Sequence, residues 1–439
     1  MMNKSVADVI TNVAHRSTRR GTLLLFAVFL CGGIIYSLVL PLGLSPDEAA
    51  HVKYIKYMAR TGSLPIWKPD GGGEAGYESQ HPPLMYATGA VVYRASSFLP
   101  ENWRWQILRW YSLLIGVCLF WVARGFFLDY FKDHNELALV PLAALSVTPL
   151  VLEYSSYPNP DIMCALWSTL AFWMAMRVAR GTARRSDQVI LSIALGLGLL
   201  TKLTALSMVP VVVLAYIFAP AAEASKRWEK CRLGIFGTFL AAMILAGWWY
   251  YRNGLLYHVV FPHTISSVLP GWPLLLVSGK AGLLIWTTLF GTFGSSFVEL
   301  GWMPFPLITL LLCGVVFCVI VAAVLTSLRR HSAKRRSACD PAHWLMGVLI
   351  MSIFVSQQYQ AWFIDFAFSF GGRYMMSGLA CSYGLIAFSL AENKRRRLYY
   401  GLWIGALLTM GALSVAYLVL SHNMVVVPGW HLLKLTIPY

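Results

Sequence analysis

The residues best placed to do chemistry lie in one short stretch, SPDEAAH, which runs from Ser45 to His51 directly after the first long apolar run. Ser45 is a good N-cap and Glu48 follows it by three residues, which predicts a capping box and a helix that begins here. Asp47 and His51 are four residues apart and share one face of that helix. Glu48 is well explained as a cap residue, whereas Asp47 is not needed for the cap. We therefore predict that Asp47 is a functional carboxylate, with His51 and Glu48 as further candidates.

Two carboxylates and an imidazole beside cationic residues suit one kind of reaction. A carboxylate can take a proton from an acceptor hydroxyl, and cations can hold a phosphate leaving group. The spacing of these residues alone favours group transfer from a phosphorylated donor without naming that donor.

Composition places these residues in a membrane protein. Of the 439 residues, 58% are hydrophobic and 12% are charged, with a mean hydropathy of +0.62. Many apolar runs are long enough to cross a bilayer. The net charge of +16 does not indicate a nucleic-acid partner, because the basic residues sit in short clusters between apolar runs. The eight cysteines form no C-x-x-C pair and no cluster with histidine, so we expect neither disulfides nor a thiolate metal site.

The charge pattern predicts an all-α, polytopic protein forming a single domain over residues 1–439. Basic residues before the first apolar run place the N-terminus in the cytoplasm. No small-residue cleavage site follows this run before Pro41, so we expect it to remain as an uncleaved transmembrane span. The first extracytoplasmic loop is residues 42–105, with two juxtamembrane helices at 46–61 and 82–98. Residues 274–300 are expected to be re-entrant or interfacial, and the C-terminus to lie outside. About eleven transmembrane helices are predicted, at residues 22–41, 106–127, 137–154, 161–178, 188–201, 203–219, 233–251, 304–328, 343–361, 374–391 and 400–420.

This topology gathers a second set of polar residues on the outer face, near Asp47. Each of them also has an ordinary structural explanation. Asp161 follows Asn159-Pro160 and suits a helix N-terminus, and Lys202 suits a snorkelling side chain. Arg373 with Tyr374 fits an interfacial anchor, His51 a satisfied interfacial histidine, and the aromatic residues an aromatic belt. The set comprises Tyr157 to Asp161, Lys202, Trp248 to Asn253, Lys280, Glu299 and Gly371 to Tyr374.

The order of these motifs along the chain resembles the GT-C glycosyltransferases, and it does so over most of the chain. That superfamily includes the protein O-mannosyltransferases and the lipid A aminoarabinose transferases. Each motif is short, and their shared order is the specific part. The motifs are Pro46-Asp47-Glu48 with His51, His81-Pro82-Pro83-Leu84, Asp161, Thr201-Lys202, Leu289 to Gly294, and Gly372-Arg373-Tyr374.

The resemblance implies roles for individual residues. Asp47 matches the first-loop acid, which acts as general base or helps to bind a metal, and Asp161 matches the acid of the second outer loop. Arg373 matches a late arginine that holds donor phosphate, with Lys202, Arg252 and Tyr374 as further donor-binding candidates.

The motif before the proline pair departs from one branch of the superfamily. The aminoarabinose transferases carry Glu-Lys where this chain has Gln80-His81, so a metal site of their kind is in doubt unless Glu78 or His81 substitutes. Gln80 and His81 are retained as substrate-binding candidates, and a divalent cation as a possible cofactor.

The resemblance implies a glycosyltransferase of the bacterial inner membrane that inverts the anomeric carbon. The donor would be a polyprenyl-phosphate-linked sugar and the acceptor a glycan, lipid or protein at the extracytoplasmic face. A transporter or flippase of lipid-linked sugars is the alternative, although most acids and cations sit at the ends of spans and no internal repeat is visible. A non-catalytic accessory subunit of envelope glycan assembly is a third possibility.

Overall fold

The computed structural model describes residues 4–262, except 44, 46, 133 and 221–223, and residues 306–333, 340–363, 372–391 and 393–422. It does not describe the side chains of residues 4–17, 224–227, 306–310, 328–333, 357–363, 372–373 and 417–422. Within the described ranges every regular element is a helix. The predicted re-entrant segment 274–300, with Lys280 and Glu299, lies outside the described residues.

The α-helices follow one another along the whole described chain, with three short 3₁₀ helices between them. They are α1 (Lys4–Val39), α2 (Glu48–Thr61), η1 (Tyr77–Gln80), α3 (Leu84–Ala95), α4 (Glu101–Tyr130), α5 (Leu139–Val147), α6 (Pro149–Tyr154), α7 (Pro160–Ala179), α8 (Arg185–Leu199), η2 (Leu203–Ser207), α9 (Met208–Phe218), α10 (Ala224–Tyr257), α13 (Pro306–Ala333), α14 (Pro341–Phe363), η3 (Gly372–Gly378), α15 (Leu379–Leu390) and α16 (Arg396–His422).

Helix is present at each of the eleven ranges predicted to span the membrane. Among the described residues, five helices are long and apolar enough to cross a bilayer, and four shorter apolar helices accompany them. The number of spans therefore stays a prediction. One predicted span, 137–154, is divided into α5 and α6, which meet at Thr148 in an extended conformation. Pro149 follows this residue, and a proline disfavours helical geometry in the residue before it.

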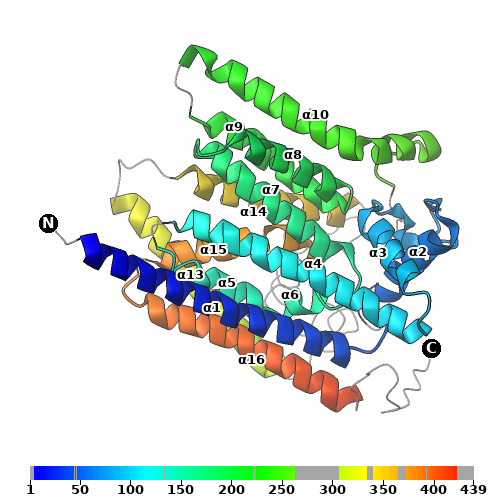
Figure 1. Cartoon of the computed structure of the whole chain (residues 1–439), viewed down its shortest axis with the longest axis horizontal. Coiled ribbons are helices and arrows are strands. Elements are labelled where there is room, and N and C mark those ends of the chain that lie inside the picture. Colours follow the sequence, from blue (N-terminus) through cyan, green and yellow to red (C-terminus); the bar gives the residue numbers. More distant parts are fainter. Residues whose placement is uncertain are drawn as a thin grey trace.

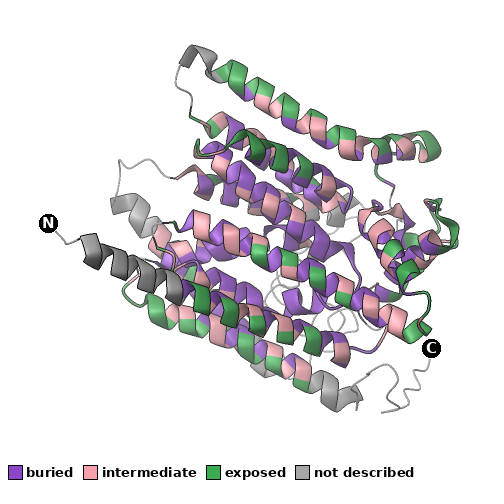
Figure 2. Cartoon of the chain, viewed as in Figure 1, coloured by how far each residue is buried: buried purple, intermediate pink, exposed green. Residues whose placement is uncertain are grey.

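Helix α7 lies in the middle of the bundle and contacts α4, α8, α9 and η3. Of its most apolar stretch 78% is buried, against 33% for α1, 22% for α10 and 28% for α16. Figure 2 shows this contrast between the central helices and α1, α10 and α16 at the two edges. Apolar side chains such as Leu24 and Ile244 are 67% and 71% exposed on these outer helices. Such faces suit contact with lipid, because hydrocarbon does not penalise an apolar surface.

Helices α2 and α3 form a small unit at one end of the bundle, next to the ends of α4 and α10 (Figure 1). The two helices share an apolar core of their own, in which the rings of Tyr54 and Tyr86 stack with centroids 3.9 Å apart. They occupy the two ranges predicted for juxtamembrane helices. Their position relative to a membrane stays a prediction.

Candidate active site

Asp47 stands just before α2 in a backbone conformation that few residues adopt. Its φ is 58° and its ψ is 4°, in the left-handed region, where a side chain other than glycine costs about 1–2 kcal/mol. Its side chain makes no capping hydrogen bond to the helix. Instead the hydroxyl of Tyr77 donates to Oδ1. The carboxylate of Asp47 is thus held by the loop that follows α2 and remains half-buried at the surface.

Glu48 turns the other way and is completely buried against Arg109 of α4. The guanidinium makes two parallel bonds to it, with Nε to Oε1 and Nη2 to Oε2 both at 2.7 Å. The backbone N–H of Gly43 also donates to Oε2, at 2.9 Å. The predicted capping box is therefore wrong, since the Glu48 carboxylate is taken by Arg109 and the hydroxyl of Ser45 makes no hydrogen bond. A charge buried in apolar surroundings needs a partner, and Arg109 satisfies that need better than a cap does.

Arg109 also forms hydrogen bonds that link the end of α1 to the start of α2. Its Nη1 donates to the carbonyls of Ser37 and Leu40 at 2.9 and 2.6 Å, and Nη2 donates to Pro41 at 2.9 Å. Arg109 is 1% exposed. Its pair with Glu48 fixes the first turn of α2, and therefore also the position of Asp47 directly before that turn.

His51 and Glu78 face Asp47 from the buried side. His51 Nδ1 lies 3.0 Å from the Tyr86 hydroxyl and 3.6 Å from Glu78 Oε2. The same oxygen of Glu78, Oε2, also lies 3.0 Å from Nε2 of His81. One ligand atom each from Asp47, His51 and Glu78 falls within 4.8 Å of the other two.

Burial and neighbouring charges shift the pKa of His51, and likewise that of Glu78, in opposite directions. Burial lowers the pKa of His51 below its ordinary value, and the nearby Glu78 only partly offsets this. His51 is therefore neutral near pH 7. Burial also opposes ionisation of Glu78, but His51 and His81 together hold the pKa of that carboxyl below its ordinary value. Glu78 is therefore an anion near pH 7.

A second buried pair lies at the start of α7. Asn159 caps that helix, because its Oδ1 accepts from the N–H groups of Asp161 and Ile162 at 3.0 and 3.2 Å. The Asp161 carboxylate is thus not the cap, and it accepts from Lys202 Nζ at 2.6 Å. Lys202 also lies 5.1 Å from the ring centroid of Tyr374. The sequence-predicted residues Asp161, Lys202 and Tyr374 therefore meet, although they come from three separate elements.

A backbone hydrogen bond links this pair to the α2–α3 unit. The N–H of Leu84, which ends the His-Pro-Pro-Leu motif, donates to the carbonyl of Leu200 at 3.0 Å. Leu200 lies two residues before Lys202. The charges of Asp161 and Lys202 are close enough to act on Tyr86 and His51 respectively. The two groups of titratable residues consequently face one region of the molecule.

Among the described residues, Arg252 forms no hydrogen bond or ion pair with Asp161, Lys202 or the cluster of Asp47, His51 and Glu78. Its Nη2 donates to the carbonyl of Pro65 at 2.8 Å, and its guanidinium lies over the rings of Trp249 and Tyr257. It therefore ties α10 to the loop after α2. Gln80 and His81 close η1 and are half-buried, and the side chain of Arg373 lies outside the described residues.

Part of the chain matches a family model and a curated relative. The family model described as dolichyl-phosphate-mannose-protein mannosyltransferase matches residues 80–251. A curated relative from Sodalis glossinidius (strain morsitans), undecaprenyl phosphate-alpha-4-amino-4-deoxy-L-arabinose arabinosyl transferase 2, is 32% identical over 121 residues. That match covers 27% of this chain and 20% of the relative.

Solved structures match nearly the whole chain. ArnT from Cupriavidus metallidurans bound to undecaprenyl phosphate has a TM-score of 0.55 at 18% identity, covering 93% of this chain and 66% of that one. The apo oligosaccharyltransferase from Archaeoglobus fulgidus has a TM-score of 0.54 at 13% identity, covering 90% and 56%. The chain therefore shares the fold of ArnT and of this oligosaccharyltransferase.

The matches cover 61% and 66% of the two ArnT structures and 20% of the curated relative, so the chain spans only part of their length. Its fold and its match over 80–251 include the His-Pro-Pro-Leu motif, Asp161, Lys202 and Trp249. Asp47, His51 and Glu78 lie just before the matched segment.

The donor set of Asp47, His51 and Glu78 fits a divalent cation. Two carboxylates and one imidazole are ligands for Zn²⁺ or Mn²⁺, and burial already keeps His51 in the neutral form that ligation requires. Glu78 is one of the two residues named above as substitutes for the carboxylate missing at Gln80, and it belongs to this set.

Sequence reasoning missed two residues of this arrangement, Arg109 and Tyr77, and it mentioned Glu78 only as a substitute. Arg109 carried a usable signal, because a charged residue well inside a predicted apolar span, 106–127, indicates a buried partner. Tyr77 and Glu78 carried none, since they lie in a glycine-rich loop where spacing says little about position.

Proposed function

We propose that the chain is a glycosyltransferase that moves a sugar from a polyprenyl-phosphate carrier to an acceptor hydroxyl. The acceptor is a glycan, lipid or protein at the extracytoplasmic face of a bacterial inner membrane. One observation carries the proposal: Asp47 holds a left-handed backbone and caps nothing, while the Asp161–Lys202 pair faces the same region. Strained backbone of this kind is typical of positions where a side chain has a chemical task.

The proposed reaction needs one base and fixed cations. Asp47 takes the proton of the acceptor hydroxyl, and the freed oxygen attacks the anomeric carbon from the side opposite the phosphate. The bond from that carbon to the phosphate oxygen breaks, and its electron pair leaves with the polyprenyl phosphate. Attack from the opposite side inverts the anomeric carbon.

Lys202 is the described cation best placed to stabilise the departing phosphate. Asp161 and the ring of Tyr374 hold its ammonium in place, so it needs little reorganisation during the reaction. Arg373 is proposed to assist, one residue before Tyr374. Glu48 is assigned a positioning role through Arg109. A divalent ion, when bound by Asp47, His51 and Glu78, would supply positive charge beside Asp47, on the side of the acceptor oxygen.

The test is transfer of radiolabelled sugar from a panel of polyprenyl-phosphate sugars by the purified protein, with and without EDTA. Asp47→Asn should leave a folded, donor-binding protein with less than about 1% of the wild-type rate, as expected for loss of a general base. Asn tolerates the left-handed conformation and can still accept from Tyr77, so folding should not change.

The matched control is Asp70→Asn, the same change in the same loop at an exposed aspartate that bonds only to Gly72 within the described residues. It should retain the wild-type rate. A near wild-type rate in Asp47→Asn would remove Asp47 from the mechanism. Absence of transfer and of donor hydrolysis in folded wild-type protein would favour a transporter or an accessory subunit.

A further inference from the structure

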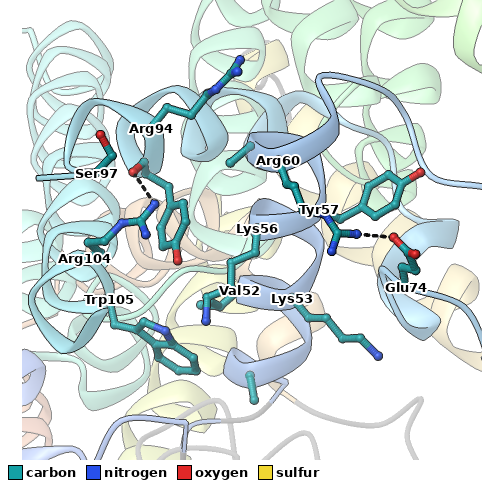
Figure 3. A pocket seen from close by; sticks show the side chains of 13 residues that line it. Val52, Lys53, Lys56, Tyr57, Arg60, Glu74, Arg94, Ser97, Arg104 and Trp105 are labelled. Carbon is teal, nitrogen blue, oxygen red and sulfur yellow. Dashed lines mark hydrogen bonds and ion pairs between the residues drawn. The ribbon is translucent and has the colours of Figure 1, made fainter. Parts of the chain in front are cut away.

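Helix α2 has a basic face on the side turned away from His51. A pocket of about 690 Å³ lies against it, closed by α3 and by the start of α4. Figure 3 shows Lys53, Lys56 and Arg60 along α2, with Arg104 and Trp105 opposite them. The spacing of these α2 residues puts them on one side of the helix, and His51 and Tyr54 are buried on the other.

The pocket is strongly cationic. Five basic side chains line it, and Glu74 is its one acidic lining residue among those the structure describes. Arg60 pairs with Glu74, and Lys56 pairs with Glu101 just outside the lining. Neither Lys53 nor Arg94 has a carboxylate within 4.0 Å in the described part of the chain. The basic residues are Lys53, Lys56, Arg60, Arg94 and Arg104.

Aromatic rings hold two of these cations in place. The guanidinium carbon of Arg104 lies 3.4 Å from the ring centroid of Tyr93, and its Nη2 donates to the carbonyl of Tyr93 at 3.0 Å. Lys56 Nζ lies 5.2 Å from the ring centroid of Trp105. Cations stacked on rings lose little freedom when an anion binds, which favours a site over a merely charged surface.

The surroundings of the pocket suit a position at the level of lipid headgroups. Arg104 and Trp105 lie near the start of α4, which is long and apolar enough to span a membrane. Further along α4, Trp110 and Leu114 are 43% and 58% exposed, as expected of a lipid-facing surface. In the turn after α3, next to the lining residue Ser97, Phe98 is 81% exposed and adds an apolar side chain.

We propose that this pocket binds the phosphate-bearing headgroup of an anionic membrane lipid. The cations meet the phosphate, while the exposed apolar residues of α3 and α4 meet the start of the acyl chains. The site is separate from the carboxylate cluster, and the proposal does not require that the chain transfers a sugar.

Native mass spectrometry of the purified full chain tests the proposal, with phosphatidylglycerol and phosphatidylcholine of equal chain length as the two probes. The wild type should retain phosphatidylglycerol in preference to phosphatidylcholine. Lys53→Glu should lower that preference by roughly 5-fold or more, the effect of a lysine near an anionic lipid surface. Lys53→Arg should keep the preference, because it keeps the charge.

The matched control is Lys68→Glu, the same charge reversal at an exposed lysine in the loop after α2 that does not line the pocket. It should bind as the wild type does. Equal preference in the wild type, Lys53→Glu and Lys68→Glu would overturn the proposal. Full displacement of phosphatidylglycerol by millimolar inorganic phosphate would also overturn it, because the pocket would then recognise free phosphate and not a lipid. None of these measurements detects sugar transfer. A negative result for lipid binding is therefore distinct from a negative result for the glycosyltransferase proposal.

Discussion

Asp47 and Glu48 are adjacent carboxylates with opposite environments. Asp47 is half-buried, accepts from a tyrosine and leaves the helix uncapped, whereas both oxygens of Glu48 are bonded to Arg109. Both oxygens of Glu48 are bonded to a buried arginine, so neither is open to an acceptor hydroxyl. At the scale of the residue, partners decide which of two neighbouring acids can react.

A divalent ion should bind at Asp47, His51 and Glu78, and Glu78→Gln should weaken its binding. Loss of one charged ligand should raise the dissociation constant for Mn²⁺ or Zn²⁺ by roughly 10-fold or more. Isothermal titration of the purified protein measures this. Glu74→Gln is the matched control, because Glu74 lies in the same loop and pairs with Arg60 at the surface. Equal affinity in wild type and Glu78→Gln would contradict the ligand assignment.

At the scale of the element, α2 depends on a residue from another helix. Arg109 joins the carbonyls at the end of α1 to the first turn of α2, so the break between these helices has a fixed geometry. The unit of α2 and α3 packs around its own apolar core. The two proposed binding sites lie on opposite faces of this unit.

Arg109→Met should destabilise the protein by about 3–5 kcal/mol, because it leaves the buried charge of Glu48 without a partner. Arg109→Lys should cost less, since it keeps the charge and loses the paired geometry. Thermal unfolding in detergent measures both. Arg94→Met, at an exposed arginine, is the control and should stay within about 0.5 kcal/mol of wild type.

The double variant Glu48→Gln with Arg109→Met separates charge from packing. It should be less destabilised than the sum of the two single variants, because neither buried charge is then left alone. Simple additivity would show that the pair contributes nothing beyond the packing of each side chain.

At the scale of the whole molecule, the two ends of the bundle carry different charge patterns. The proposed sites lie at the end where α7 begins, and α7 carries the chain about 30 Å to the other end. There Arg177 pairs with Asp187 at 3.1 Å, and Arg180 pairs with Asp340. Basic residues gathered at this second end favour a cytoplasmic position for it.

Cysteine labelling in spheroplasts tests this orientation. Lys68→Cys, in the loop after α2, should react with a membrane-impermeant maleimide in intact spheroplasts. Thr182→Cys, after α7, should react only once the membrane is permeabilised. Both positions are exposed, so accessibility within the protein does not limit either reaction. The reverse pattern would place the carboxylate cluster in the cytoplasm and contradict the proposed location.

Much of the fold follows from local signals along the chain. Apolar runs predicted helix at every range where the described structure has a spanning or near-spanning helix, because burial in lipid or protein demands long apolar stretches. The break at Thr148 was missed, although Pro149 signalled it. The capping box was wrong because a buried arginine, distant in sequence, competed successfully for Glu48.

The sequence by itself determined that this is a helical membrane protein, that Asp47 follows the first span, and that the motifs occur in GT-C order. Those features depend on composition and local spacing, which a linear chain records. Only the tertiary structure decided that Glu78 joins Asp47 and His51, that Lys202 pairs with Asp161, and that Arg109 takes Glu48. Such contacts join residues 27 to 61 positions apart, and packing alone brings them together.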